Sequence, residues 1–140
     1  MLQSLRMDSI DWEPLIAAAT AARARAYAPY SRFQVGAALR MEDGSVHAAA
    51  NVENGIPSLA ICAERNAMAA AASAGLRRPQ AVVVVADMTP PASPCGLCRQ
   101  TLVEFARDLP GLPILLVNLQ GERQETTLAE LLPRPFALPG

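Results

Sequence analysis

The chain has 140 residues, the size of one ordinary domain, and we expect a single domain over residues 1–140. Hydrophobic residues make up 51% of the chain and charged residues 18%, which excludes a disordered polypeptide. The net charge of -1 leaves no basic surplus to neutralise a phosphate backbone, so nucleic acid is not an expected partner.

The sequence predicts neither a signal peptide nor a membrane span. The first ten residues lack the long apolar core of a signal peptide, and the most apolar stretches are far shorter than a membrane helix. We therefore expect a cytoplasmic protein with no membrane partner. In that reducing compartment, cysteines close in sequence indicate metal binding or catalysis more often than a disulfide. The three cysteines of this chain cannot all pair with one another.

The first element is expected to be a helix that starts at Trp12, is capped by Asp11 and stops before Pro29. Its apolar residues recur at helical spacing, and they are Leu15, Ile16, Ala19, Ala22 and Ala26. Residues 33–41 and 46–52 then predict two strands. Glu42-Asp43-Gly44 predicts a hairpin turn between them, because Asp-Gly readily supplies a positive φ.

Residues 62–74 predict an alanine-rich helix that is closed by Gly75. The helix is apolar nearly all round after its first turn, so we expect it to be buried on more than one side, including at a subunit interface.

The second half of the chain alternates strands and helices. Residues 81–86 form a continuous β-branched run typical of an interior strand, and residues 95–106 predict a helix. A strand over 114–118 follows, with a short fifth strand at Thr126-Thr127 and a last helix capped by Thr127. This order predicts a mixed sheet of about five strands covered by helices, an α/β fold.

Three thiols could bind one metal ion. Cys95 and Cys98 lie one helical turn apart at a predicted helix start, and Cys62 opens another helix. Helix N-termini favour thiolates, and three protein ligands leave a tetrahedral zinc ion one open position, as in catalytic sites. His47 lies within a strand and has no partner at ligand spacing, so we interpret it as an ordinary strand residue.

Glu64 follows Cys62 by two residues, and Pro94 precedes Cys95. This is the pattern of the zinc deaminases, in which a carboxylate beside the metal, but not bound to it, moves protons. The alternatives are three buried cysteines that act as small hydrophobes, and a glutamate that stabilises the first turn of a helix. Their joint occurrence in this pattern favours the metal site.

Five blocks in order resemble the small, homotetrameric cytidine deaminases, and they extend from about Ala26 to Phe136. The blocks are Pro29-Tyr30-Ser31-x-Phe33-x-Val35-Gly36-Ala37-Ala38, Asn51-Val52-Glu53-Asn54, Cys62-Ala63-Glu64-Arg65-x-Ala67, Ser93-Pro94-Cys95-Gly96-x-Cys98-Arg99-Gln100 and Leu131-Leu132-Pro133-x-x-Phe136. The resemblance implies a three-layer α/β/α fold, one zinc ion per subunit and a homotetramer whose sites are shared across interfaces.

The resemblance also implies a reaction, the hydrolytic deamination of cytidine and 2′-deoxycytidine in pyrimidine salvage. Cys62, Cys95 and Cys98 would bind zinc, and Glu64 would be the proton shuttle. The remaining roles that it implies concern the substrate. Asn51 and Glu53 would hold the ribose hydroxyls, Phe33 would pack against the pyrimidine ring, and the N–H of Ala63 would meet the base carbonyl. Ser93 would line the exit of the departing amino group, and Phe136 would reach toward a neighbouring subunit's site.

Two positions need separate hypotheses. Arg65 could donate hydrogen bonds to the thiolates and withdraw charge from the metal, whereas the alternative is an ordinary surface salt bridge. The segment Gly55 to Ser58 departs from the family pattern, because the family has an aromatic residue near the position of Pro57. We therefore expect more tolerance for substituents on the base than the family usually shows.

Three other functions remain as alternatives. A deaminase of modified cytosine nucleosides or nucleoside antibiotics differs only in its substrate. A polynucleotide deaminase is disfavoured by the slightly acidic charge balance. A zinc-stabilised binding module would need a fourth ligand and leaves Glu64 without a purpose.

Overall fold

The five strands form one mixed sheet in the computed structural model, which describes residues 9–139. The strands are β1 (Val35–Met41), β2 (Val46–Ala50), β3 (Pro79–Ala86), β4 (Pro113–Val117) and β5 (Arg123–Thr127). Their order across the sheet is β2-β1-β3-β4-β5. The pair β3 and β4 is parallel, and the other three pairs are antiparallel.

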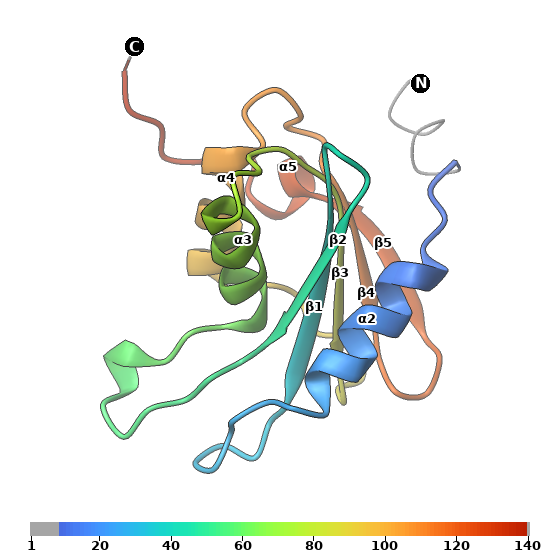
Figure 1. The fold of residues 1–140 in the computed structure, drawn as a ribbon, viewed down its shortest axis with the longest axis vertical. Coiled ribbons are helices and arrows are strands. Elements are labelled where there is room, and N and C mark those ends of the chain that lie inside the picture. The colour runs from blue at the N-terminus through green and yellow to red at the C-terminus, as the bar shows by residue number, and fades with distance from the viewer. Residues whose placement is uncertain (1–8, 140) are drawn as a thin grey trace.

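Helices cover both faces of this sheet (Figure 1). The helices are α2 (Glu13–Arg23), α3 (Ala63–Ser73), α4 (Gly96–Phe105) and the short α5 (Leu128–Leu131), with a 3-10 turn at Pro57–Leu59. Helix α2 lies on one face, and α3, α4 and α5 lie on the other. The expected three-layer α/β/α architecture with five strands is therefore confirmed.

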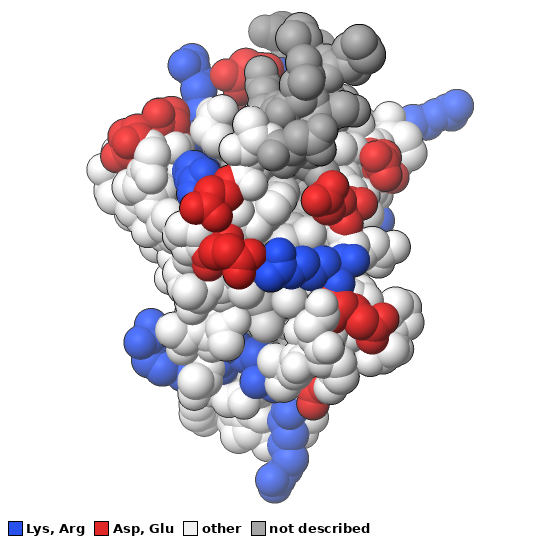
Figure 2. Space-filling model, turned by 90° about the vertical axis from the view of Figure 1, so that its right-hand side faces the viewer, with Lys and Arg blue, Asp and Glu red and all other residues white. Residues whose placement is uncertain are grey.

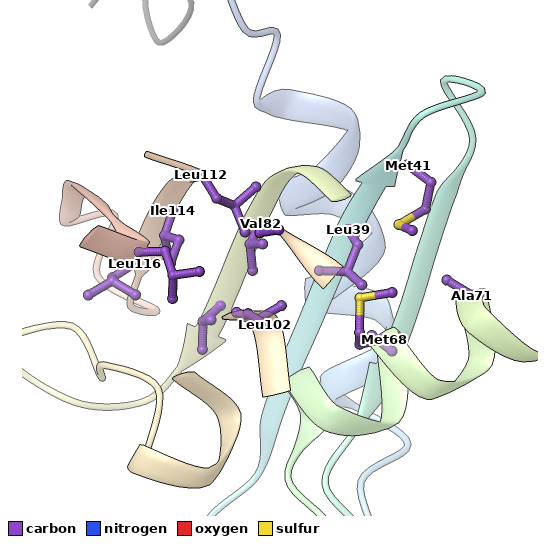
Figure 3. Close-up of a cluster of buried hydrophobic side chains, with 13 residues drawn as sticks. Leu39, Met41, Met68, Ala71, Val82, Leu102, Leu112, Ile114 and Leu116 are labelled. Atoms are coloured by element: carbon purple, nitrogen blue, oxygen red, sulfur yellow. The ribbon is translucent and has the colours of Figure 1, made fainter. Parts of the chain in front are cut away.

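The core is divided between these two faces by the alternation of side chains along β3. Val82 lies on the side of the sheet that faces α3 and α4, in one cluster with Met68 and Leu102 (Figure 3), and Val84 belongs to the same cluster. Val83 and Val85 belong to the opposite cluster beneath α2. All four valines are buried, as predicted for an interior strand covered on both faces.

Helix α2 approaches the sheet closely at Gly36 of β1. A Cβ atom at this position would lie 1.9 Å from the carbonyl oxygen of Ala19 and 2.8 Å from the nitrogen of Arg23. The absence of a side chain therefore allows the helix to rest directly on β1.

Helix α2 differs from its prediction at both ends. Its N-cap is Trp12, which makes no side-chain capping bond, whereas Asp11 lies one residue earlier and accepts a hydrogen bond from the N–H of Glu13 at 3.3 Å. The helix ends at Arg23 rather than extending through Ala26, because the chain turns there and Tyr27 pairs with Val52. Residues 1–8, most of the segment searched for a signal peptide, lie outside the described residues.

Helix α3 is buried on one side only in the single chain. Ala67, Met68 and Ala71 are buried, whereas Ala69 and Ala70 are exposed. The single chain therefore accounts for the side of the helix that faces the sheet, and the expected burial of another side at a subunit interface stays a prediction. Gly75 follows the helix with a φ of 96°, as expected of a glycine that ends a helix.

The cap of α5 is confirmed in part. The Thr127 hydroxyl accepts a hydrogen bond from the N–H of Glu130 at 3.2 Å. In a capping box, the Glu130 carboxylate would also accept a hydrogen bond from the backbone N–H of Thr127. It accepts one from the hydroxyl of Thr126 instead, at 3.2 Å.

Charges of both signs are interspersed on the face of the molecule shown in Figure 2. One ion pair, Arg123 with Glu13, joins β5 to the start of α2 at 2.9 Å. Within the described part of the chain, no helix is both long and apolar enough to cross a membrane.

Candidate zinc and nucleoside site

Three thiols meet where two helices begin. Cys62 is the N-cap residue of α3, Cys95 is the N-cap residue of α4, and Cys98 lies in the first turn of α4. The sulfur of Cys95 lies 3.6 Å from that of Cys62 and 3.5 Å from that of Cys98. The structure thus brings together three residues that the sequence separates by up to 36 positions.

The thiols fit a zinc ion. Two sulfurs bound tetrahedrally at a Zn–S distance of about 2.3 Å are about 3.8 Å apart, close to the observed separations. Within residues 9–139, the group of metal-ligating side chains holds these three cysteines and no fourth member. Three ligands fit a zinc ion that keeps one position open, as a catalytic site requires.

The surroundings of Cys62 favour its thiolate. The hydrogen bond from the Cys98 thiol, with further contributions from Cys95 and the Arg65 guanidinium, lowers the pKa of Cys62 to about 5 despite partial burial. Arg65 also donates a hydrogen bond from Nη2 to the carbonyl of Ala60 at 3.1 Å, while its Nε is buried without a partner. The arginine therefore places a positive charge beside the thiol group.

Glu64 is a buried carboxyl group on the first turn of α3. Its side chain is only 5% exposed, and this burial raises the pKa of Glu64, with the negative charge of Cys62 adding to the effect. A carboxyl group with a raised pKa keeps its proton to a higher pH than a free carboxyl group does, which suits a general acid and base.

Asn51 holds the backbone that leads into β1. Its Oδ1 accepts a hydrogen bond from the N–H of Val35 at 2.9 Å, and its Nδ2 donates to the carbonyl of Phe33 at 2.8 Å. The amide that the resemblance assigns to ribose binding therefore also fixes the position of Phe33.

Glu53 holds the same loop at Tyr30 and Ser31, which precede Phe33. Its Oε1 accepts hydrogen bonds from the N–H groups of Tyr30 at 3.0 Å and Ser31 at 3.1 Å, and its Oε2 accepts one from the Ser31 hydroxyl. The Ser31 hydroxyl, followed by the backbone N–H groups, holds the pKa of Glu53 below its usual value. Glu53 is thus an ionised carboxylate that orders the loop before Phe33.

Short β-bridges join this loop region to the thiols. Val52 pairs with Tyr27 on one side and with Ile61 on the other, and Ile61 directly precedes Cys62. The backbone groups of Val52 and Ile61 exchange two hydrogen bonds of 2.9 Å. Asn51 and Glu53, which flank Val52, are therefore held beside the start of α3.

The remaining predicted site residues differ in exposure. Ala63 is buried at the first position of α3, where a backbone N–H has no acceptor within its own helix. Ser93 is exposed and lies just before the α4 thiols. Phe33 is 37% exposed and Phe136 is 68% exposed, so neither is a core residue of the single chain. His47 lies in β2, where its Nε2 is 2.9 Å from the Ser45 hydroxyl and away from the thiol group.

Sequence reasoning gave no role to Arg99 and Gln100, which follow Cys98 in α4. The Arg99 guanidinium donates from Nε to the carbonyl of Pro94 at 2.7 Å and from Nη2 to the Ser93 hydroxyl at 3.0 Å. The Gln100 side chain bonds to the backbone of Phe136. Their place in the same motif block as Cys95 and Cys98 indicated that they lie near the site, but the sequence did not reveal their hydrogen-bond partners.

The fold and the three grouped cysteines fit a zinc-binding deaminase. The family model described as "Cytidine and deoxycytidylate deaminase zinc-binding region" matches residues 11–109. The chain belongs to this family.

Relatives and solved structures agree with that assignment. Cytidine deaminase from Sporosarcina psychrophila is 48% identical over 128 residues, which cover 91% of this chain and 93% of that protein. Cytidine deaminase from Halalkalibacterium halodurans is 50% identical over 127 residues, or 91% and 95% of the two chains. The crystal structure of cytidine deaminase from Burkholderia pseudomallei has a TM-score of 0.86 at 45% identity, covering 91% of this chain and all of that one (100%).

Proposed function

We propose that the protein catalyses the zinc-dependent hydrolytic deamination of cytidine and 2′-deoxycytidine, which releases ammonia and the uridine products. The observation that carries this proposal is the convergence of three thiols beside the buried carboxyl group of Glu64. The family and the named relatives, which are cytidine deaminases, support the same reaction. A binding module would give the buried Glu64 no purpose.

Cys62, Cys95 and Cys98 would hold the zinc ion at the two helix N-termini. When bound, zinc supplies a hydroxide nucleophile at neutral pH. Arg65 would offset the negative charge of the thiolates, which otherwise opposes ionisation of water, and the two helix N-termini would add to that effect.

Glu64 would move the protons of the reaction. The proton that it takes from the attacking water goes first to N3 of the pyrimidine, and a second transfer carries a proton to the departing amino group. Burial supports this role because it raises the pKa of Glu64 above that of a free glutamate.

The substrate would lie between the thiols and the loop that Asn51 and Glu53 hold. Phe33 would pack against the pyrimidine, the N–H of Ala63 would bind the base carbonyl, and Ser93 would face the departing amino group. For Asn51 and Glu53 we propose a double role, in which they bind ribose hydroxyl groups and fix the loop that carries Phe33. Preordering of this kind reduces the entropy lost on binding.

We further propose a homotetramer in which Phe136 reaches a neighbouring subunit's site. Large apolar side chains are exposed around the β-bridges next to Cys62 and support this assembly: Tyr27, Val52, Ile56, Leu59 and Ile61. Light scattering that finds an active monomer would contradict this proposal. The cytoplasm is the proposed location, because three close free thiols suit a reducing compartment.

The exposed turn at Pro57–Leu59 supports the proposed tolerance for substituted bases. Kinetics on cytidines substituted at the ring or the 4-amino group should favour the natural sequence over Pro57→Tyr. Equal relative rates for both proteins would refute this part of the proposal.

One experiment tests the proposed function as a whole. Metal analysis of the purified protein should find one zinc per chain, and an ultraviolet assay should detect deamination of cytidine. Glu64→Gln should keep its zinc and lose about 100-fold or more in turnover, as expected for a general acid and base. Glu104→Gln, which alters an exposed carboxylate on α4, is the matched control and should remain active. Near-normal turnover by Glu64→Gln would refute the role of Glu64.

A further inference from the structure

The C-terminal segment has no regular structure of its own. From Leu132 to Pro139 the chain forms neither helix nor strand, and Phe136 within it is 68% exposed. Hydrophobic burial within the single chain therefore does not fix the position of Phe136, which leaves its polar contacts to do so.

The side chain of Gln100 supplies two such contacts. Its Oε1 accepts a hydrogen bond from the N–H of Phe136 at 3.1 Å, and its Nε2 donates one to the carbonyl of Phe136 at 2.8 Å. The two backbone partners also define the orientation of the amide, since an N–H must meet the oxygen and a carbonyl must meet the nitrogen. The side-chain amide of Gln100 thus binds both backbone polar groups of Phe136, the N–H and the carbonyl.

Arg99, the preceding residue of α4, holds the beginning of the same segment. Its Nη1 donates to the carbonyl of Leu131 at 2.7 Å, while its other nitrogens bind Ser93 and Pro94 on the loop before Cys95. The chain is therefore attached twice to the part of α4 that carries the thiols, at Leu131, directly before the segment, through Arg99 and at Phe136 through Gln100.

We propose that Gln100 is a positioning residue of the substrate site, which sets the place of Phe136 relative to the helix that carries Cys95 and Cys98. This inference rests on the proposed function, in which Phe136 completes the site of a neighbouring subunit. The proposal gives Gln100 no contact with metal or substrate, because its side-chain amide is engaged by the backbone of Phe136. It acts by limiting the conformations of the segment before assembly and binding.

The test removes the hydrogen bonds and keeps the volume of the side chain. Gln100→Met should raise the KM for cytidine about fivefold or more, the lower limit expected for the loss of two hydrogen bonds, and leave kcat and zinc content close to wild type. Hydrogen exchange at the Phe136 amide should become faster in the same protein. Gln100→Glu keeps the acceptor for the N–H of Phe136 but sets a carboxylate oxygen against the carbonyl of Phe136, so its KM should also exceed that of the wild type. Gln124→Met, on the exposed edge strand β5, is the matched control and should resemble wild type.

A double-mutant cycle separates positioning from a general effect on structure. If Gln100 acts through Phe136, Gln100→Met should add little to the KM of Phe136→Ala. Additive effects on KM, or unchanged exchange at Phe136 in Gln100→Met, would overturn the proposal. An unchanged KM in Phe136→Ala alone would overturn its premise and leave the role of Glu64 untouched. Failure of the proposed function itself would be visible separately, as a zinc-loaded wild-type protein that does not deaminate cytidine.

Discussion

Replacement of Asn51 by alanine tests whether this residue orders the loop that carries Phe33. The change removes two hydrogen bonds, of 2.9 Å to the N–H of Val35 and 2.8 Å to the carbonyl of Phe33. Each such bond contributes about 0.5–1.5 kcal/mol net, so the free energy of unfolding should fall by about 1–3 kcal/mol. The KM for cytidine should rise as well, because Phe33 loses its fixed position.

The assay compares melting temperatures at equal protein and zinc concentrations, since bound metal and assembly shift the apparent stability. A loss of this size should lower the Tm by several degrees. Asn54→Ala is the matched control, because Asn54 makes only a local bond to the N–H of Ile56 at 3.0 Å. If Asn51→Ala melts no lower than Asn54→Ala, the loop does not depend on Asn51 and the reasoning is refuted.

Three further predictions concern packing, acid stability and the metal. Gly36→Ala should destabilise the protein by about 1–3 kcal/mol in urea unfolding, because the added Cβ would lie 1.9 Å from a carbonyl oxygen of α2; a neutral result would show that α2 shifts freely. The backbone N–H groups of Arg77 and Arg78 hold the pKa of Glu42 below its usual value. Glu42 therefore stabilises the fold above about pH 4.5, and this contribution is lost as the pH falls through its lower folded pKa. Glu42→Gln should be less stable than wild type at pH 7 but not at pH 2, and a difference independent of pH would contradict this. Arg65→Ala should reduce turnover and zinc content and change their pH dependence, and normal values for all three would refute metal tuning by Arg65.

The elements that the sequence predicted well are those set by local patterns. The side chains of the valine run in β3 alternate between two covered faces of the sheet. Because every residue of such a strand is buried, an unbroken apolar run was enough to predict it. The closeness of the Cys95 and Cys98 thiols could be predicted because it depends only on the geometry of one helical turn. The approach of Cys62 to them depends on how two distant helices pack, and only the deaminase pattern indicated it.

The features that the sequence did not predict depend on distant backbone partners. Asn51 and Glu53 were assigned to ribose by resemblance, but their bonds to the loop before β1 join residues 16 to 23 positions apart. Gln100 binds a backbone group 36 residues away, and nothing in its local pattern indicates this. The early end of α2 likewise follows from a β-bridge of Tyr27 to Val52, a pairing invisible to helical periodicity.

The order of the strands leaves β2 and β5 at the two edges of the sheet, where unpaired backbone groups could recruit a strand from another molecule. The two edges are protected unequally. On β5, the exposed residues Arg123, Gln124 and Glu125 place charges of both signs along the edge, which opposes aggregation. On β2, Val46–Ala50 carries no carboxylate, arginine or proline. Under partial unfolding, β2 is therefore the edge at which strand-to-strand aggregation should begin.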